Sequence, residues 1–315
     1  MPFPESLRSL GPSRSRPNRL PLTYIGLLCL LCASLAGPRA VAAQETPYFV
    51  AYSHHLEEPG NLEIELNSIY GVQHAGNDFI APWVEFEYGA KAWWTTEVYL
   101  DGQATARDAT VFSGYRWENR FRVLPREHWI NPVLYVEFEN INGADKSLLE
   151  VVDNDGEGDL TGPSSETRSE KKREIEAKLI LGSYFKGWTF AENFIAEKNV
   201  RHAPFEFGYA VGVSRPLALA ARPDRCNLCP ENFQAGVEMY GGLGTHEHFG
   251  LRETSHYVAP TVAWTAANGA TFTISPTFGV TGTSARFLLR FAVSYEFDQF
   301  GRTAGHLFRN RGGGQ

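Results

Sequence analysis

Residues 286–297 read Arg-Phe-Leu-Leu-Arg-Phe-Ala-Val-Ser-Tyr-Glu-Phe, with a large apolar or aromatic side chain at every odd-numbered position. A period of two indicates an extended strand with two unlike faces. Twelve residues are long for a strand of a soluble protein but suit a tilted crossing of a membrane. Because Arg290 and Glu296 stand among lipid-compatible side chains, the pattern predicts a barrel with lipid outside and polar groups inside.

The first 43 residues have the features of a cleaved export signal. Several arginines precede an apolar run at residues 24–35, and the small residues Val41-Ala42-Ala43 follow. This order is typical of a Sec-type signal peptide, here cleaved after Ala43. The apolar run is too short for a membrane-spanning helix, which needs about 20 residues.

Export leaves an acidic chain. The five arginines and one glutamate of residues 1–43 carry +4, so the net charge of −7 becomes −11 for the remainder. A chain this acidic is not expected to bind nucleic acid, because such binding relies on basic contacts to phosphates. The 30 glycines and the 13% of aromatic residues fit a sheet of many strands joined by tight turns.

Twelve segments have the alternation or length of a barrel strand, and the pattern is also compatible with ten or fourteen strands. The segments are residues 61–71, 79–89, 92–102, 110–121, 130–140, 171–182, 188–199, 205–215, 232–241, 256–266, 270–280 and 286–297. The strand at 188–199 is ambiguous, because Glu192 and Asn193 break either phase. We therefore predict an all-β, antiparallel transmembrane β-barrel at residues 61–297. A periplasmic lead-in at residues 44–60 and a flexible tail at residues 298–315 flank it.

An even number of strands places both ends of the barrel in the periplasm, with short turns there and longer loops outside. Residues 141–170 then form the longest outer loop, whereas the long connection at 216–231 falls unexpectedly on the periplasmic side. The acidic stretch from Asp153 has the beginning of a calcium-binding loop. Its twelfth residue is Ser164, where an EF-hand needs glutamate, so a solvated loop is expected. Most tryptophans lie near strand ends, as in an interfacial girdle.

The signal segment, the even set of alternating strands and the aromatic end of the last strand resemble a Gram-negative outer-membrane β-barrel protein. This resemblance implies an outer-membrane location, export through the Sec pathway, and contact with outer-membrane lipid and the barrel-assembly machinery. The assembly signal of such proteins ends at a C-terminal aromatic residue, and the matching alternate positions here are Phe291, Val293, Tyr295 and Phe297. Residues 298–315 follow them, which departs from the pattern.

A narrower similarity lies in the hairpin at residues 83–93, Trp-Val-Glu-Phe-Glu-Tyr-Gly-Ala-Lys-Ala-Trp. A strand that ends in Glu-Tyr-Gly before a short turn resembles the outer-membrane channel family named for phenol-degradation gene clusters. That resemblance implies transport of hydrophobic compounds.

Charged residues on the polar strand faces are predicted to line the lumen. They are Glu63, Glu65, Glu85, Glu87, Glu97, Arg116, Glu137, Glu139, Glu174, Glu176, Lys178, Glu238, Arg290 and Glu296. The excess of carboxylates favours a pore for cations or a polar wall for a small ligand. A salt-bridge network that fills a narrow barrel explains the same residues, because buried carboxylates need water or basic partners.

Cys226 and Cys229 form the only cysteine pair after the signal segment. A disulfide is the expected state in the periplasm, and a metal site or a redox motif is the alternative. A redox motif usually opens a helix that lowers the thiol pKa, but Pro223 and Pro230 flank this pair. A metal site would need two more ligands.

Candidates for catalysis are weak. His54-His55 and His246-Glu247-His248 offer ligands for a transition metal, although isolated surface histidines are commoner. The serine–histidine neighbours at 53–54 and 255–256 point to opposite faces if they lie in strands. We predict no catalytic residue, metal or cofactor. The favoured function is a channel or transporter for small solutes, hydrophobic or cationic. The alternatives are a non-conducting barrel with a structural or surface role and an outer-membrane lipid hydrolase.

Overall fold

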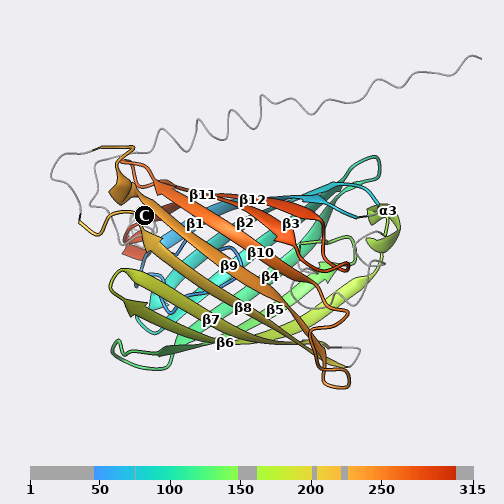
Figure 1. Ribbon diagram of the computed structural model, residues 1–315, viewed down its shortest axis with the longest axis horizontal. Helices are drawn as coiled ribbons and strands as arrows, with labels where there is room; N and C mark the ends of the chain where they lie inside the picture. The colour runs from blue at the N-terminus through green and yellow to red at the C-terminus, as the bar shows by residue number, and fades with distance from the viewer. Residues whose placement is uncertain (1–45, 75, 148–161, 201–203, 221–225, 303–315) are drawn as a thin grey trace, which may run out of the picture. The chain divides into compact units, whose positions relative to one another are not determined.

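A computed structural model describes residues 46–74, 76–147, 162–200, 204–220 and 226–302. Within this part of the chain every strand pairs with its sequence neighbours, and β1 pairs with β12 to close a barrel (Figure 1). The twelve strands are β1 (Leu62–Val72), β2 (Phe79–Lys91), β3 (Trp94–Thr105), β4 (Thr110–Arg122), β5 (Asn131–Asn142), β6 (Lys171–Phe185), β7 (Trp188–Asn199), β8 (Phe205–Pro216), β9 (Phe233–Thr245), β10 (His256–Thr265), β11 (Thr271–Gly279) and β12 (Phe287–Phe297). The predicted closed antiparallel barrel of twelve strands is confirmed.

The ambiguous strand β7 keeps a single phase. Asn193 is buried inside the barrel, whereas Glu192 is exposed on the outer face between Phe190 and Phe194. Glu192 is a polar residue on the apolar outer face, and Asn193 is a polar residue on the inner face. The alternation of outward and inward side chains therefore continues through both residues.

Tight turns join several strands at the end of the barrel that carries the end of β12. Lys186 and Gly187 both have positive φ angles, of 50° and 86°, between β6 and β7. A two-residue turn with this geometry matches the right-handed twist of the strands that it connects. Because short turns and the chain ends mark the periplasmic side of outer-membrane barrels, we call this the periplasmic end.

The outer face of the barrel is apolar. Its exposed side chains include Leu100, Leu134, Val136, Leu179 and Ile274, each of which is at least 40% accessible. At the periplasmic end aromatic rings stack in rows across neighbouring strands, such as Trp93–Trp94–Phe121 and Phe233–Trp264–Phe272. An apolar band bordered by aromatic rings is the surface that a lipid bilayer requires.

Short helical segments lie outside the strands in the described part of the chain. Helix α3 (Ser164–Thr167) belongs to the connection between β5 and β6, and the 3-10 helix η2 (Pro230–Asn232) precedes β9. Among the residues described, none of the helices has the length and apolar composition needed to cross a membrane.

The start of the predicted flexible tail is attached to the barrel. The backbone N–H of Gln299 donates to Asn61 Oδ1 at 2.9 Å, and Gly301 N–H donates to Gly60 O at 3.1 Å. The rest of the predicted tail, the signal segment and residues 148–161 of the outer loop lie outside the described residues.

Candidate functional site

The barrel interior holds a large set of charged residues. All fourteen residues predicted to line the lumen lie at inward-facing strand positions, and most of them are buried. Most of them also line one of two cavities inside the barrel. The barrel interior is therefore the candidate functional site.

Strand register arranges glutamates into one continuous row. Each of nine glutamates on adjacent strands is directly opposite the next, from β12 through β1 to β8. The row is Glu296, Glu63, Glu87, Glu97, Glu118, Glu137, Glu176, Glu197 and Glu206. We call it the glutamate row. Like charges directly opposite one another destabilise a sheet, so the fold alone gives no reason for this pattern.

The glutamate row also climbs the barrel wall. Glu296 is next to the periplasmic end of β12, whereas Glu206 is the second residue of β8, which begins at the opposite end. Neighbouring residues across strands rise along the axis because barrel strands are tilted and staggered. Carboxylates consequently follow a path from one mouth of the barrel to the other.

Three basic side chains compensate the middle of the row. Arg120 contacts Glu97, lies 2.5 Å from Glu87 Oε1 through Nη2, and lies 3.1 Å from Glu118 Oε1 through Nε. Arg116 bridges Asp101 at 3.1 Å and Glu137 at 3.5 Å. Lys178 Nζ lies 2.8 Å from Glu176 Oε1. Each arginine thus contacts more than one carboxylate, and Lys178 contacts one glutamate of the row.

Tyrosine hydroxyls complete this network. The Tyr99 hydroxyl lies 2.5 Å from Glu97 Oε2 and 2.6 Å from Glu118 Oε2, and Tyr135 donates to Glu137 Oε2 at 2.6 Å. The Tyr52 hydroxyl donates to Glu118 Oε2 at 3.0 Å. Because buried carboxylates without donors are costly, these hydroxyls stabilise the charged wall of β3 to β6.

Tyr52 belongs to a chain segment that enters the barrel. Residues 46–60, which we call the inner segment, precede β1. The two carboxylate oxygens of Glu238 on β9 accept hydrogen bonds from three successive backbone N–H groups of this segment. The donors are Phe49 at 3.0 Å, Val50 at 2.9 Å and Ala51 at 2.9 Å. One side chain of the wall thereby fixes a whole turn of the inner segment.

Further contacts fix the inner segment to other strands. The side chain of Asn193 accepts from the Tyr52 N–H at 2.6 Å and donates to the Tyr52 carbonyl at 2.8 Å. Glycines make room at two points, because a Cβ atom at Gly212 or Gly182 would collide with Tyr48 or His54. Residues 46–60 of the predicted periplasmic lead-in at 44–60 are thus attached to the barrel, and residues 44 and 45 lie outside the described residues. Residues 46–60 have no periodic pattern, and their partners are far away in the sequence.

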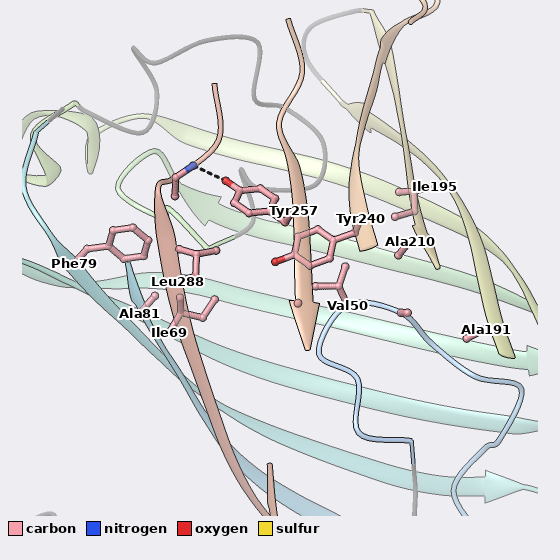
Figure 2. Packing of buried hydrophobic residues seen from close by; sticks show 13 residues of the cluster. Val50, Ile69, Phe79, Ala81, Ala191, Ile195, Ala210, Tyr240, Tyr257 and Leu288 are labelled. Atoms are coloured by element: carbon pink, nitrogen blue, oxygen red, sulfur yellow. Dashed lines mark hydrogen bonds between the residues drawn. The ribbon is translucent and has the colours of Figure 1, made fainter. Parts of the chain in front are cut away.

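Part of the inner wall is apolar. Val50 and Ala51 of the inner segment pack in a buried cluster with Ile69, Tyr240 and Leu288 (Figure 2). The indole of Trp83 packs against the same cluster from β2, so it faces the interior and is not part of the girdle. The lumen therefore has apolar wall as well as charged wall, and the inner segment contacts both.

A cavity of about 250 Å³ opens beside the inner segment toward the periplasmic end. Besides Glu87 and Glu97 of the glutamate row, its wall includes five further acidic residues of β1, β2, β12 and the following turn, which we call the acidic vestibule. They are Glu63, Glu65, Glu85, Glu296 and Asp298. Glu65 and Glu85 are directly opposite each other and form a second row beside the glutamate row.

The other mouth is narrowed by the connection between β5 and β6. Lys146 is buried there, its N–H donating to Gln103 Oε1 at 3.4 Å and its Nζ donating to the Gly162 carbonyl at 2.9 Å. Ser164 of α3 is also buried, with its hydroxyl 2.7 Å from that of Thr105. Both described ends of the loop expected to be solvated thus pack into the barrel.

The histidine and cysteine candidates are placed as follows. His54 is buried near the periplasmic end with Nε2 3.5 Å from Glu127 Oε1, and its ring lies 4.3 Å from that of His55. Desolvation by burial lowers the pKa of His54, and Glu127 opposes the shift.

Cys226 and Cys229 form a disulfide, as predicted.

The predictions from sequence omitted several members of the site. Glu118 shares the parity of Arg116 and could have been found from it. Glu197 lies on the strand whose phase was ambiguous, and Glu206 begins a strand with no charged neighbour on its polar face. The lateral register that joins them into a row is a property of the folded sheet.

The fold has known counterparts. An outer membrane channel from Pseudomonas putida F1 has 7% sequence identity and a TM-score of 0.52, over 79% of this chain and 100% of that chain. The KdgM porin in complex with disordered oligogalacturonate has 8% identity and a TM-score of 0.44, over 75% and 99% of the two chains. The NanC porin has 8% identity and a TM-score of 0.44, over 73% and 97%. No protein-family model and no curated protein matches the sequence.

At these identities the similarity concerns the fold alone. The closed antiparallel barrel and the apolar outer belt place the chain in the class of outer-membrane β-barrels.

Proposed function

We propose that this protein is a narrow outer-membrane channel that passes small cations and small cationic solutes along the glutamate row. The observation that carries the proposal is the row itself, nine carboxylates in direct register from one mouth to the other. Rings or rows of acidic side chains select cations in channels. Their mutual repulsion is a cost that a cation in transit relieves.

The acidic vestibule also favours selectivity for cations over anions. Glu65 and Glu85 flank the periplasmic part of the path, whereas Arg116, Arg120 and Lys178 compensate its middle. A cation entering from the periplasmic side meets the carboxylates of the acidic vestibule first. The inner segment occupies part of the lumen and keeps the path narrow, so the proposal is limited to small solutes.

A second candidate function is transport of small hydrophobic compounds, as the similarity of residues 83–93 to the channel family of phenol-degradation gene clusters implies. The buried apolar cluster of the inner wall, which includes Ile69, Tyr240 and Leu288, favours it. Sec-dependent export, assembly by the barrel-assembly machinery and contact with outer-membrane lipid belong to both proposals.

Flux into proteoliposomes tests the cation path. Solutes of similar size and different charge, namely protonated ethanolamine, ethylene glycol and glycolate, should enter in that order of rate. Replacing Glu63, Glu65 and Glu85 together by glutamine should bring the cation rate close to that of the neutral solute. The matched control is Glu192→Gln, which removes one carboxylate from the outer face and should leave the order unchanged. Equal rates for all three solutes through the unaltered protein contradict the proposal.

A further inference from the structure

The long connection between β8 and β9 exposes leucines at the periplasmic end. Leu217, Leu219 and Leu228 have 59%, 57% and 74% of their surfaces accessible. Leu219 lies against Gly187 of the turn between β6 and β7. An exposed leucine next to an apolar belt indicates a surface that interacts with a partner or a membrane.

The part of the connection that carries Leu228 is fixed to the outer wall. Asn227 accepts the indole N–H of Trp264 through its carbonyl oxygen at 2.6 Å, and its Oδ1 accepts the Ala267 N–H at 3.1 Å. Trp264 stacks between Phe233 and Phe272 in the aromatic row at this end. Leu228 is therefore next to the border between the apolar belt and water.

Covalent and hydrogen-bonded links give this tip a fixed shape. The disulfide joins Cys226 to Cys229 around Leu228, and the Asn232 side chain donates to the Cys226 carbonyl at 2.5 Å. A rigid tip can present an apolar side chain without the entropy cost of ordering a flexible loop. The basic side chain of Arg215, over the ring of Trp188, stands on the same outer rim, where lipid phosphates are found.

We propose that the disulfide-closed tip at residues 226–229 is a membrane-contacting foot that inserts Leu228 into the periplasmic leaflet of the surrounding lipid. Continuity with the lipid-facing belt identifies the occupant, because Trp264 belongs to both surfaces. The foot accounts for a long connection on the side where barrels have short turns. Its action does not depend on whether the lumen conducts.

Photo-crosslinking tests the foot. The full chain with p-benzoylphenylalanine at position 228 is reconstituted into liposomes of phosphatidylethanolamine and phosphatidylglycerol. After irradiation, its mass is measured by intact-protein mass spectrometry. Position 134, where Leu134 is 49% accessible on the outer wall, is the lipid-facing reference. Position 268, where Asn268 lines the acidic vestibule at the same end, is the matched control.

We expect the mass of one phospholipid to be added at 228 at least fivefold more often than at 268, and at a yield close to that at 134. Reduction of the disulfide should lower the yield at 228 at least twofold and leave that at 134 unchanged. A yield at 228 no higher than at 268, or crosslinks at 228 to a second copy of the chain, overturns the proposal. If the label at 228 prevents the heat-modifiable fold, position 219 takes its place, and the same outcomes decide.

Discussion

Replacing Glu238 by glutamine tests how the inner segment is fixed in the lumen. In the structure, Glu238 Oε2 accepts from Val50 and Ala51 and Oε1 accepts from Phe49. A glutamine oxygen in the place of Oε2 keeps two of these bonds without the charge. The amide NH2 in the place of Oε1 faces the Phe49 N–H and cannot accept it.

Hydrogen bonds to charged groups contribute about 1.5–3 kcal/mol each, against about 1 kcal/mol for neutral ones. Losing one bond and weakening two should destabilise the docked segment by about 3 kcal/mol. Since 1.4 kcal/mol is a factor of ten, the undocked population should rise roughly 100-fold.

Hydrogen exchange of the peptide at residues 46–57, followed by mass spectrometry, measures this population, because exchange of protected amides requires local opening. The protection of the Phe49, Val50 and Ala51 amides should fall by that factor. Glu192→Gln, on the outer face, should leave it unchanged. If Glu238→Gln leaves a heat-modifiable barrel whose protection at these amides changes less than threefold, the account of the inner segment is refuted.

Three further predictions concern assembly, pH and lipid contact. Phe297→Ala should lower the amount of folded protein in the outer membrane several-fold, measured by heat-modifiable mobility on gels; normal levels would refute the role of Phe291, Val293, Tyr295 and Phe297 as the assembly signal. Burial lowers the pKa of His54 below its ordinary 6.5, so the undocked segment takes up protons that the docked one does not, and docking should weaken as the pH falls below about 6.5. Amide protection of residues 46–57 should therefore decrease between pH 7.5 and pH 5, and the decrease should be smaller in His54→Asn; a decrease of the same size in that variant would exclude His54 as its source. Glu192→Leu removes a carboxylate from the lipid face and should stabilise the barrel by about 1 kcal/mol, seen as a higher temperature of heat modification; a lower temperature would contradict the outward orientation of Glu192.

The strands could be predicted because alternation is a local property. Apolar residues such as Leu134, Val136 and Phe138 alternate with Tyr135 and Glu137 over a few positions, and one face must meet lipid while the other does not. The predicted limits of the strands therefore lie close to the observed ones. The same rule placed the charged residues inside, since each follows its strand parity.

The inner segment could not be predicted from a local pattern. Val50, Tyr52 and His54 follow no period. Their positions depend on Glu238, Asn193 and Gly182, which lie more than a hundred residues away. The same limit applies to Trp83, whose strand-end position is typical of a girdle but whose inward parity sends it to the apolar cluster.

The glutamate row required the sheet register. Opposition of Glu97 to Glu118, and of Glu176 to Glu197, is set by pairing between strands, and a shift of one residue would send these side chains to lipid. Single strands show only that each glutamate is on a polar face. The continuity of the row, and with it the proposed path for cations, appears only when the strands are paired.

The reversal potential of the refolded chain in planar bilayers, under a tenfold gradient of potassium chloride, tests the cation path most directly. A perfectly cation-selective pore would give about 59 mV with the sign set by potassium. We predict single-channel steps with a reversal potential of that sign and more than half that size. A reversal potential near zero, or one with the sign set by chloride, would contradict the assignment of the glutamate row as a cation path.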